Sequence, residues 1–240
     1  TNNNWLSSTL FVNIANNFDK FNYKTPPHDG DALPRVRTWI REYVSSSDVL
    51  LNNLQATHFE QFNSEWYGQA YAGYLEMMYA GVGSELLYRP FGQSWAVGAD
   101  INWVKQRDWN DTLKMAEYDV ITGHMTGYWQ VPYVNDVSAK LSVGRYLAGD
   151  VGATIDLSKR FSSGVIAGVF ATKTDVSSEE YGEGSFTKGI YVTIPFDLML
   201  LHPTTNKGTV SWVPLTRDGG QMLNRRFGLY NLTSNASFPH

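Results

Sequence analysis

The alternation of side-chain types in the stretch SWAVGADINWVKQ, residues 94–106, constrains the fold of this chain most strongly. Successive side chains of a β-strand point to opposite faces, so a period of two separates this stretch into two sets. One set is apolar, with a tryptophan at each end: Trp95, Val97, Ala99, Ile101 and Trp103. The other set is small or polar through its middle: Ala96, Gly98, Asp100, Asn102, Val104 and Gln106. The alternation predicts a strand that separates two different environments.

The same alternation recurs along the chain. Residues 150–160 separate Val151 and Ile155 from Thr154 and Asp156, and residues 136–147 divide in the same way. Connections rich in Gly, Pro, Asn and Asp stand between such segments and supply turn geometry. Further strands are expected near residues 5–16, 36–44, 49–61, 65–78, 81–89, 115–130, 164–173, 187–200, 207–215 and 222–231. No helix longer than about two turns is predicted.

The length and the aromatic residues favour a membrane barrel. At about 9–11 residues for each membrane strand, 240 residues hold roughly 11–13 antiparallel strands. Aromatic residues are expected at strand ends, where they meet the two membrane interfaces: Trp95, Trp103, Tyr88 with Phe91, Trp129 with Tyr133, Phe227 and Tyr230. We therefore predict an all-β fold, a single antiparallel transmembrane β-barrel over residues 1–240. Asp100 and Asn102 would face its wet interior, and glycines such as Gly98, Gly144, Gly152 and Gly168 would leave space there.

Patterning alone leaves a second fold open. A soluble β-sandwich or a lipocalin-like barrel shows the same alternation with its apolar faces inward. The low charged fraction of 18% favours the membrane interpretation. No run approaches the roughly 18 apolar residues of a spanning helix. Cysteine is absent, so disulfides and thiolate sites are excluded, and a net charge of −4 argues against nucleic acid as the partner.

No enzyme signature or metal motif is present in the sequence. The five histidines have no ligand spacing and are expected in turns or lining the interior: His28, His58, His124, His202 and His240. The stretch GVGSE, residues 81–85, lacks the final glycine of a nucleophile elbow. Asp100 and Asp156 are interpreted as solvated interior acids rather than a glycosidase pair, and HDGD, residues 28–31, as a turn rather than a calcium loop. We expect no catalysis, no cofactor and no metal.

The basic segment PRVRTWIREY, residues 34–43, is the main candidate for ligand contact. At strand spacing, Arg35, Arg37, Trp39, Arg41 and Tyr43 share one face. An arginine at the membrane midplane costs roughly 2–4 kcal/mol, so this face should be interior or periplasmic. It would bind sugars and carboxylates, or else form an arginine ladder paired with interior acids. The full candidate set is Arg35, Arg37, Trp39, Arg41, Tyr43, Asp100, Asn102, Asp156 and Arg226, the last of which would face inward from the final strand.

Three stretches carry a resemblance to a known family: FDKFNYKTPPHDGDALPRVRTWIREYV (18–44), AGYLEMMYAGVGSELLYRPFGQSWAVGADINWVKQRD (72–108) and VSWVPLTRDGGQMLNRRFGLYNLT (210–233). Together they resemble the YjbH/GfcD family of exopolysaccharide-associated outer-membrane proteins. The resemblance implies a Gram-negative outer-membrane barrel that helps an exopolysaccharide or capsule polymer across or onto the outer membrane. Members of the family are longer than this chain, so the sequence is expected to be the C-terminal barrel of a two-barrel protein. The family supplies no catalytic residues.

These observations predict a non-catalytic outer-membrane barrel that contacts a sliding polymer through its polar interior. The expected partners are the exopolysaccharide chain, outer-membrane lipid, periplasmic secretion proteins and an N-terminal barrel of the full-length chain. Two alternatives remain. One is a plugged barrel that docks periplasmic partners, and the other is an outer-membrane hydrolase.

Overall fold

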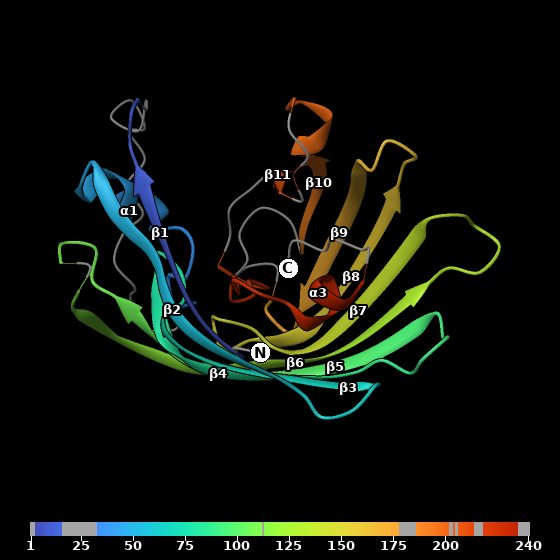
Figure 1. Ribbon diagram of the computed structural model, residues 1–240. Coiled ribbons are helices and arrows are strands. Elements are labelled where there is room, and N and C mark those ends of the chain that lie inside the picture. Colours follow the sequence, from blue (N-terminus) through green and yellow to red (C-terminus); the bar gives the residue numbers. More distant parts are fainter. Residues whose placement is uncertain are drawn as a thin grey trace.

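Among the described residues, 11 strands form a single antiparallel sheet, in which each strand pairs with the next in sequence (Figure 1). The computed structural model describes residues 3–15, 33–111, 113–177, 186–201, 204, 206–213 and 218–234. The all-β antiparallel class is confirmed, and the strand number falls within the expected range. The strands are β1 (Asn4–Val12), β2 (Val49–Gln61), β3 (Trp66–Tyr74), β4 (Tyr79–Tyr88), β5 (Trp95–Arg107), β6 (Met115–Gln130), β7 (Val137–Arg145), β8 (Val151–Arg160), β9 (Ile166–Thr174), β10 (Thr187–Pro195) and β11 (Lys207–Trp212).

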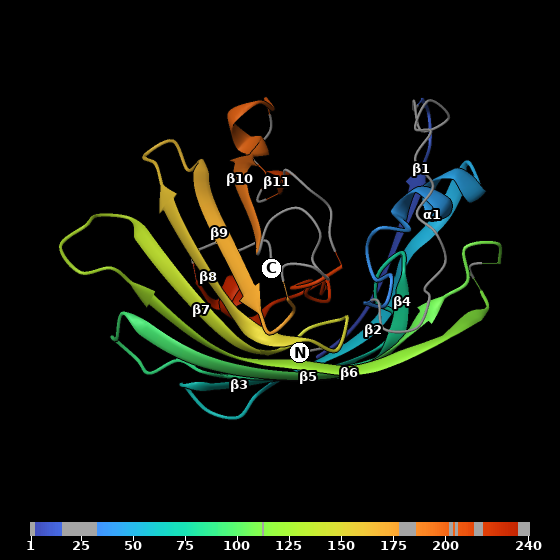
Figure 2. The same cartoon turned by 180° about the vertical axis from the view of Figure 1, so that it is seen from behind.

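The sheet curves into an open trough rather than a closed barrel (Figures 1 and 2). The edge strands β1 and β11 each pair with one neighbour and not with each other. The expected closure is therefore absent from the described residues. One physical reason is that the described part of the chain after β11 does not return to the sheet as a strand. Its described part, residues 218–234, lies on the concave side of the trough.

Close backbone approaches at glycines accompany the curvature. A Cβ atom on Gly81 would collide with the carbonyl oxygen of Trp103, and one on Gly144 would collide with the carbonyl oxygen of Gly123. Only a residue without a side chain permits such approaches, and glycine kinks are a known device for bending sheets. Of the glycines expected on polar faces, Gly144 and Gly152 therefore have a backbone role, since a Cβ atom on either would strike a backbone oxygen of the neighbouring strand.

The two faces of the sheet have opposite character. On β5, Ile101 on the convex face is 59% exposed, whereas its neighbour Asn102 on the concave face is 1% exposed. The same division holds on β8, where Ile155 is exposed and Asp156 is buried. The predicted alternation is confirmed, and the alternative with apolar faces inward is wrong for this sheet.

Two predicted strands are wrong because the chain there follows other geometry. Residues 36–44 form a turn followed by helix α1 (Ile40–Ser46), and residues 222–231 are irregular up to helix α3 (Leu229–Thr233). Within α1, Tyr43 and Val44 are buried against the apolar cluster that includes Leu75 and Met78. Together with Ile40 they stand at helical spacing, a signal that the alternating arginines obscured.

A third helical element among the described residues, the short 3₁₀-helix η2 (Phe196–Leu198), directly follows β10. Among the described helices, none is long and apolar enough to cross a membrane. The HDGD segment at residues 28–31, as well as His202 and His240, lie outside the described residues.

Candidate functional site

The C-terminal segment, residues 218–233, crosses the polar concave face and is here called the interior segment (Figure 2). Its backbone N–H at Gly220 donates to the carboxylate of Asp150 at 2.7 Å. Further along, the ring of Tyr230 stacks on that of Tyr128, with centroids 4.0 Å apart and planes 6° apart. Backbone, ionic and aromatic contacts together hold this segment against the sheet.

Arg225 is the central charged contact of the interior segment. Its Nη1 lies 3.1 Å from Glu85 Oε2, and its Nη2 lies 3.8 Å from Asp100 Oδ1. Glu85 also accepts a hydrogen bond from the backbone N–H of Leu229 at 3.2 Å. Burial by itself lowers the pKa of Arg225, but the carboxylates of Glu85 and Asp100 raise that pKa well above its usual value. The guanidinium therefore stays charged between two acids.

Arg37 forms an ion pair with Glu76 and also hydrogen-bonds to the interior segment. Its guanidinium donates to both carboxylate oxygens of Glu76, at 2.5 and 3.1 Å, and to the carbonyl oxygen of Met222 at 2.8 Å. Asp218 accepts from the backbone N–H of Arg37 at 2.8 Å and lies 3.5 Å from the Arg35 guanidinium. The two arginines are therefore engaged by acids, as the ladder interpretation expected, although the acids are Glu76 and Asp218.

The common face expected for the basic segment is wrong, because this segment is not a strand. Trp39 packs edge-on against Trp109, with ring centroids 4.8 Å apart, and the hydroxyl of the buried Tyr43 donates to the backbone oxygen of Arg107. Arg41 lies on α1 and is half-buried. The structure thus brings Arg35 and Arg37 to the interior segment by polar contacts. Trp39 and Tyr43 belong instead to an apolar cluster, which also contains Leu223 of the interior segment.

The predicted interior acids do lie on the concave face. Asp100 accepts a hydrogen bond from Asn102 at 2.8 Å. Asp156 is 1% exposed and accepts from the Tyr191 hydroxyl at 2.8 Å, with Lys140 Nζ 3.8 Å away. The expectation of solvated acids is wrong, because these carboxylates are buried in polar and ionic pairs.

Arg225 and Arg226 exchange their expected places. Arg226 is exposed and lies over the Phe227 ring, 5.9 Å from its centroid, so its predicted inward position is wrong. Phe227 and Tyr230, expected at an interface, belong instead to the interior segment. The sequence carries a signal for Arg225: at strand spacing it shares a face with the apolar Leu223 and Phe227, where a charged side chain is out of place.

The interior segment divides the concave face into a filled half and an open half. Beneath Met222, Leu223 and Arg225, a cavity over β5 to β7 measures only about 20 Å³. Between this segment and the inner faces of β8 to β11, a cavity of about 420 Å³ stays open. Of these two cavities, the one with room for a ligand lies in the open half.

Metal sites and histidines add little chemistry. No group of three or more potential metal ligands occurs among the residues that the structure describes. His124 is buried on the concave face and packs edge-on against Tyr146, with centroids 4.7 Å apart, in agreement with its expected interior position. His58 lies on the convex face instead, 3.5 Å from Glu60.

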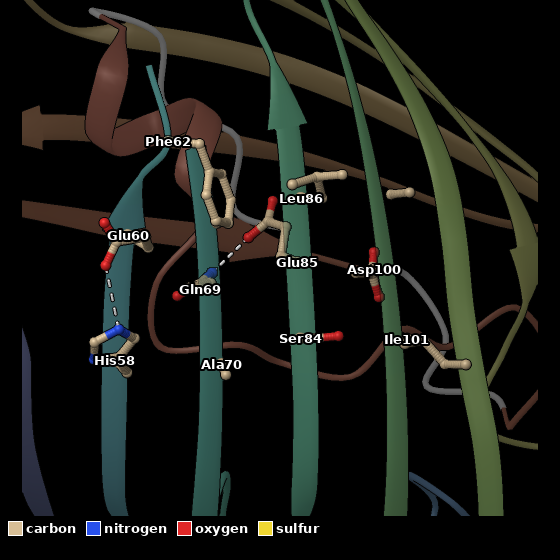
Figure 3. A pocket seen from close by; sticks show the side chains of 12 residues that line it. His58, Glu60, Phe62, Gln69, Ala70, Ser84, Glu85, Leu86, Asp100 and Ile101 are labelled. Carbon is tan, nitrogen blue, oxygen red and sulfur yellow. Dashed lines mark hydrogen bonds and ion pairs between the residues drawn. The ribbon is translucent and has the colours of Figure 1, made fainter. Parts of the chain in front are cut away.

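The convex face carries a shallow hollow beside this histidine (Figure 3). Small side chains at Ala70, Ser84 and Ala99 leave a space of about 480 Å³, bordered by Phe62 and Leu86. The hollow is mainly apolar, so it continues the character of the convex face.

Aromatic side chains form a row across one end of this convex face. Trp66 and Tyr88 are cross-strand partners with ring centroids 4.8 Å apart, and Tyr88 lies 5.9 Å from Trp95. Trp95 in turn is the cross-strand partner of Trp129. The row therefore runs continuously over β3 to β6, as expected for aromatic residues at strand ends.

The sheet exposes its apolar face and buries its ionic face beneath the interior segment. The chain is therefore an all-β protein whose polar side chains point inward and whose apolar side chains point outward. The chain belongs to the YjbH family. The model of this family, described as "Exopolysaccharide biosynthesis protein YbjH", matches residues 1–235. The resemblance recognised in the sequence is thus confirmed.

A relative from Escherichia coli (strain K12), "Uncharacterized lipoprotein YjbH", is 55% identical over 234 residues. The match covers 96% of this chain and 33% of the relative, so the chain spans about a third of the relative's length. No solved structure matches this chain.

Proposed function

We propose that this chain forms part of the wall of an outer-membrane barrel and contacts an exopolysaccharide during its export or surface assembly, without catalysis. The inverted arrangement of the sheet carries this proposal. Large apolar side chains such as Ile101 and Ile121 are exposed on the convex face, while Asn102 and Asp156 are buried on the concave face. In water, such an exposed apolar surface is unfavourable, whereas contact with acyl chains satisfies it.

The dimensions of the convex face support contact with lipid. Trp95 and Trp103 bound the apolar stretch of β5 and are separated by eight residue steps, or about 26 Å along an extended strand. With a strand tilt of about 40°, this stretch spans about 20 Å, which is on the scale of the roughly 25 Å apolar band of outer-membrane barrels. The aromatic row that includes Trp66 and Trp129 lies where one interface would be.

The family and the open half of the trough support contact with a polymer. The family's description concerns exopolysaccharide biosynthesis, and the relative's name is that of a lipoprotein. The cavity beside the interior segment is lined by threonine hydroxyls and an aromatic ring, and these groups suit weak, exchangeable contacts with sugars.

Spin labelling of the full-length protein in liposomes tests the lipid contact. This chain contains no cysteine, so after replacement of any cysteine elsewhere, Ile121→Cys and Thr209→Cys give unique label sites on the convex and concave faces. We expect the label at residue 121 to be accessible to oxygen and shielded from a water-soluble nickel complex. The label at residue 209 should show the reverse, and equal behaviour of the two labels would contradict the proposal.

Deletion of the gene tests the role in export. With all neighbouring genes intact, secreted polymer should fall, and the intact gene should restore it. Unchanged secretion would refute the proposed role even if the convex face contacts lipid.

A second candidate, a plugged barrel that docks periplasmic partners, is favoured by one observation. The interior segment is fixed by Arg225 between Glu85 and Asp100 and fills half of the trough. Conductance in planar bilayers separates the two functions, because a plugged barrel should show none with or without polymer.

A further inference from the structure

The open cavity of the trough differs in chemistry from the filled half. It lies between the interior segment and the inner faces of β8 to β11, and Ile40, Asn52, Met77 and Met78 also line it. Its volume of about 420 Å³ falls within the usual range of ligand sites, about 300–1,000 Å³. Its strand side presents Thr154, Phe170, Thr172, Thr187, Thr209 and Ser211. These side chains come from four consecutive strands, so the cavity is a continuous part of the concave surface.

Aromatic rings cover glycines on the floor of the trough. Phe170 and Gly189 are cross-strand partners, and a Cβ atom on Gly189 would meet the Phe170 ring. Tyr191 covers Gly168, its partner across the same two strands, in the same way. The space expected above Gly168 is therefore filled, and the ring of Phe170 forms part of the cavity wall. An aromatic face of this kind packs against the apolar C–H face of a ring-shaped ligand.

Hydroxyl groups surround this aromatic ring. Thr172 and Thr154 hydroxyl oxygens are 2.7 Å apart, and Thr154 is also 2.7 Å from the Tyr146 hydroxyl. On the opposite side, the Thr209 hydroxyl lies 2.8 Å from that of Thr193. Each hydroxyl offers one donor and two acceptor sites, so a cluster of them can exchange hydrogen bonds with ligand hydroxyls in several arrangements.

Formal charge is balanced within the cavity. Among the described residues that line it, only Arg37 and Glu76 are charged, and they bind each other through two hydrogen bonds of 2.5 and 3.1 Å. An anionic ligand would have to compete with Glu76 for the guanidinium. An aromatic wall, many hydroxyls and balanced charge suit a ligand that is polar, ring-shaped and uncharged.

We propose that this cavity is a binding subsite for uncharged sugar residues of a polysaccharide. The inference rests on the proposed function and deepens it by assigning the polymer contact to the hydroxyl-lined half of the trough. The basic residues singled out in the sequence, Arg35 and Arg37, then position the interior segment that forms the opposite wall of the cavity.

The test uses the full-length protein in detergent micelles and fragments of exopolysaccharide from the bacterium that carries the gene. Anion exchange separates these fragments into neutral and acidic pools, and calorimetry measures their binding. We expect the neutral pool to bind. The combined variant Thr172→Val and Thr209→Val, which keeps side-chain shape and removes two hydroxyls, should weaken that binding at least about fivefold. Phe170→Leu should weaken it as well.

Thr126→Val is the matched control. Its hydroxyl is paired with that of Ser142 at 3.0 Å on the same face, but it lies beneath the interior segment and outside the open cavity. This variant should bind the neutral pool like the parent. Circular dichroism confirms that each variant is folded.

The outcomes separate the subsite from the wider function. Neutral binding that the cavity variants leave unchanged, or binding confined to the acidic pool, would overturn the subsite and leave polymer contact standing. If neither pool binds, the polymer contact in the proposed function fails along with the subsite.

Discussion

Arg225 provides the sharpest test of how the interior segment is held. The side chain is 17% exposed and lies between the carboxylates of Glu85 and Asp100, which are 3% and 8% exposed. Replacing Arg225 by glutamine leaves two acids close together without their cation. Removing one partner of a buried ion pair costs about 3–5 kcal/mol, because the remaining charge is neither solvated nor paired.

This free energy should appear as local opening of the interior segment. Hydrogen exchange followed by mass spectrometry measures it directly on peptides that cover residues 218–233. The amide of Leu229 is a suitable reporter, since it donates to Glu85. If the substitution lowers the free energy of local opening by about 3 kcal/mol, amide exchange that depends on this opening should become about a hundredfold faster.

The neighbouring arginine gives the control. Arg226 is exposed and lies over Phe227, so Arg226→Gln should change stability by no more than about 0.5 kcal/mol. In a double-mutant cycle, Arg225→Gln combined with Glu85→Gln should cost less than the sum of the two single changes, because they disrupt one interaction. Equal exchange in the two arginine variants would refute the assignment of Arg225 as the anchor.

Three further predictions concern the sheet and the contacts of the interior segment. Gly123→Ala should lower the free energy of unfolding by about 1–3 kcal/mol in chemical unfolding, because the new Cβ would strike the backbone oxygen of Asp100. Gly127→Ala on the same strand should be as stable as the parent, because no atom lies within 4 Å of its Cβ. Burial raises the pKa of Asp150, so the ionised carboxylate destabilises the folded state. As the pH falls from neutrality through this raised pKa towards the unfolded value of about 3.9, the parent should gain stability relative to Asp150→Asn. A stability difference that does not change with pH would contradict this sign. Replacing Tyr230 by leucine removes its stack on the sheet and should raise hydrogen exchange in α3 with little change in β9 and β10.

Much of the sheet could be predicted from the sequence, since a period of two is a local property. The stretch from Ser94 to Gln106 forms β5 with its expected faces, Asp100 and Asn102 inward and Trp95 and Trp103 outward. The prediction was wrong for residues 34–43, where alternating arginines are typical of a strand but Ile40, Tyr43 and Val44 stand at helical spacing. A short segment carries both patterns at once, and only its packing decides between them.

The spacing of the strands, the character of each face and the membership of the family can all be predicted from the amino-acid sequence, because each depends on the order of side chains along the chain. The open edge of the described sheet and the position of the interior segment inside the trough, in contrast, follow from contacts that form when the chain folds. Such contacts also decide that Arg225, rather than Arg226, meets Glu85 and Asp100. Such pairings join residues far apart in sequence, and their free energy depends on burial and distance, which no local pattern contains.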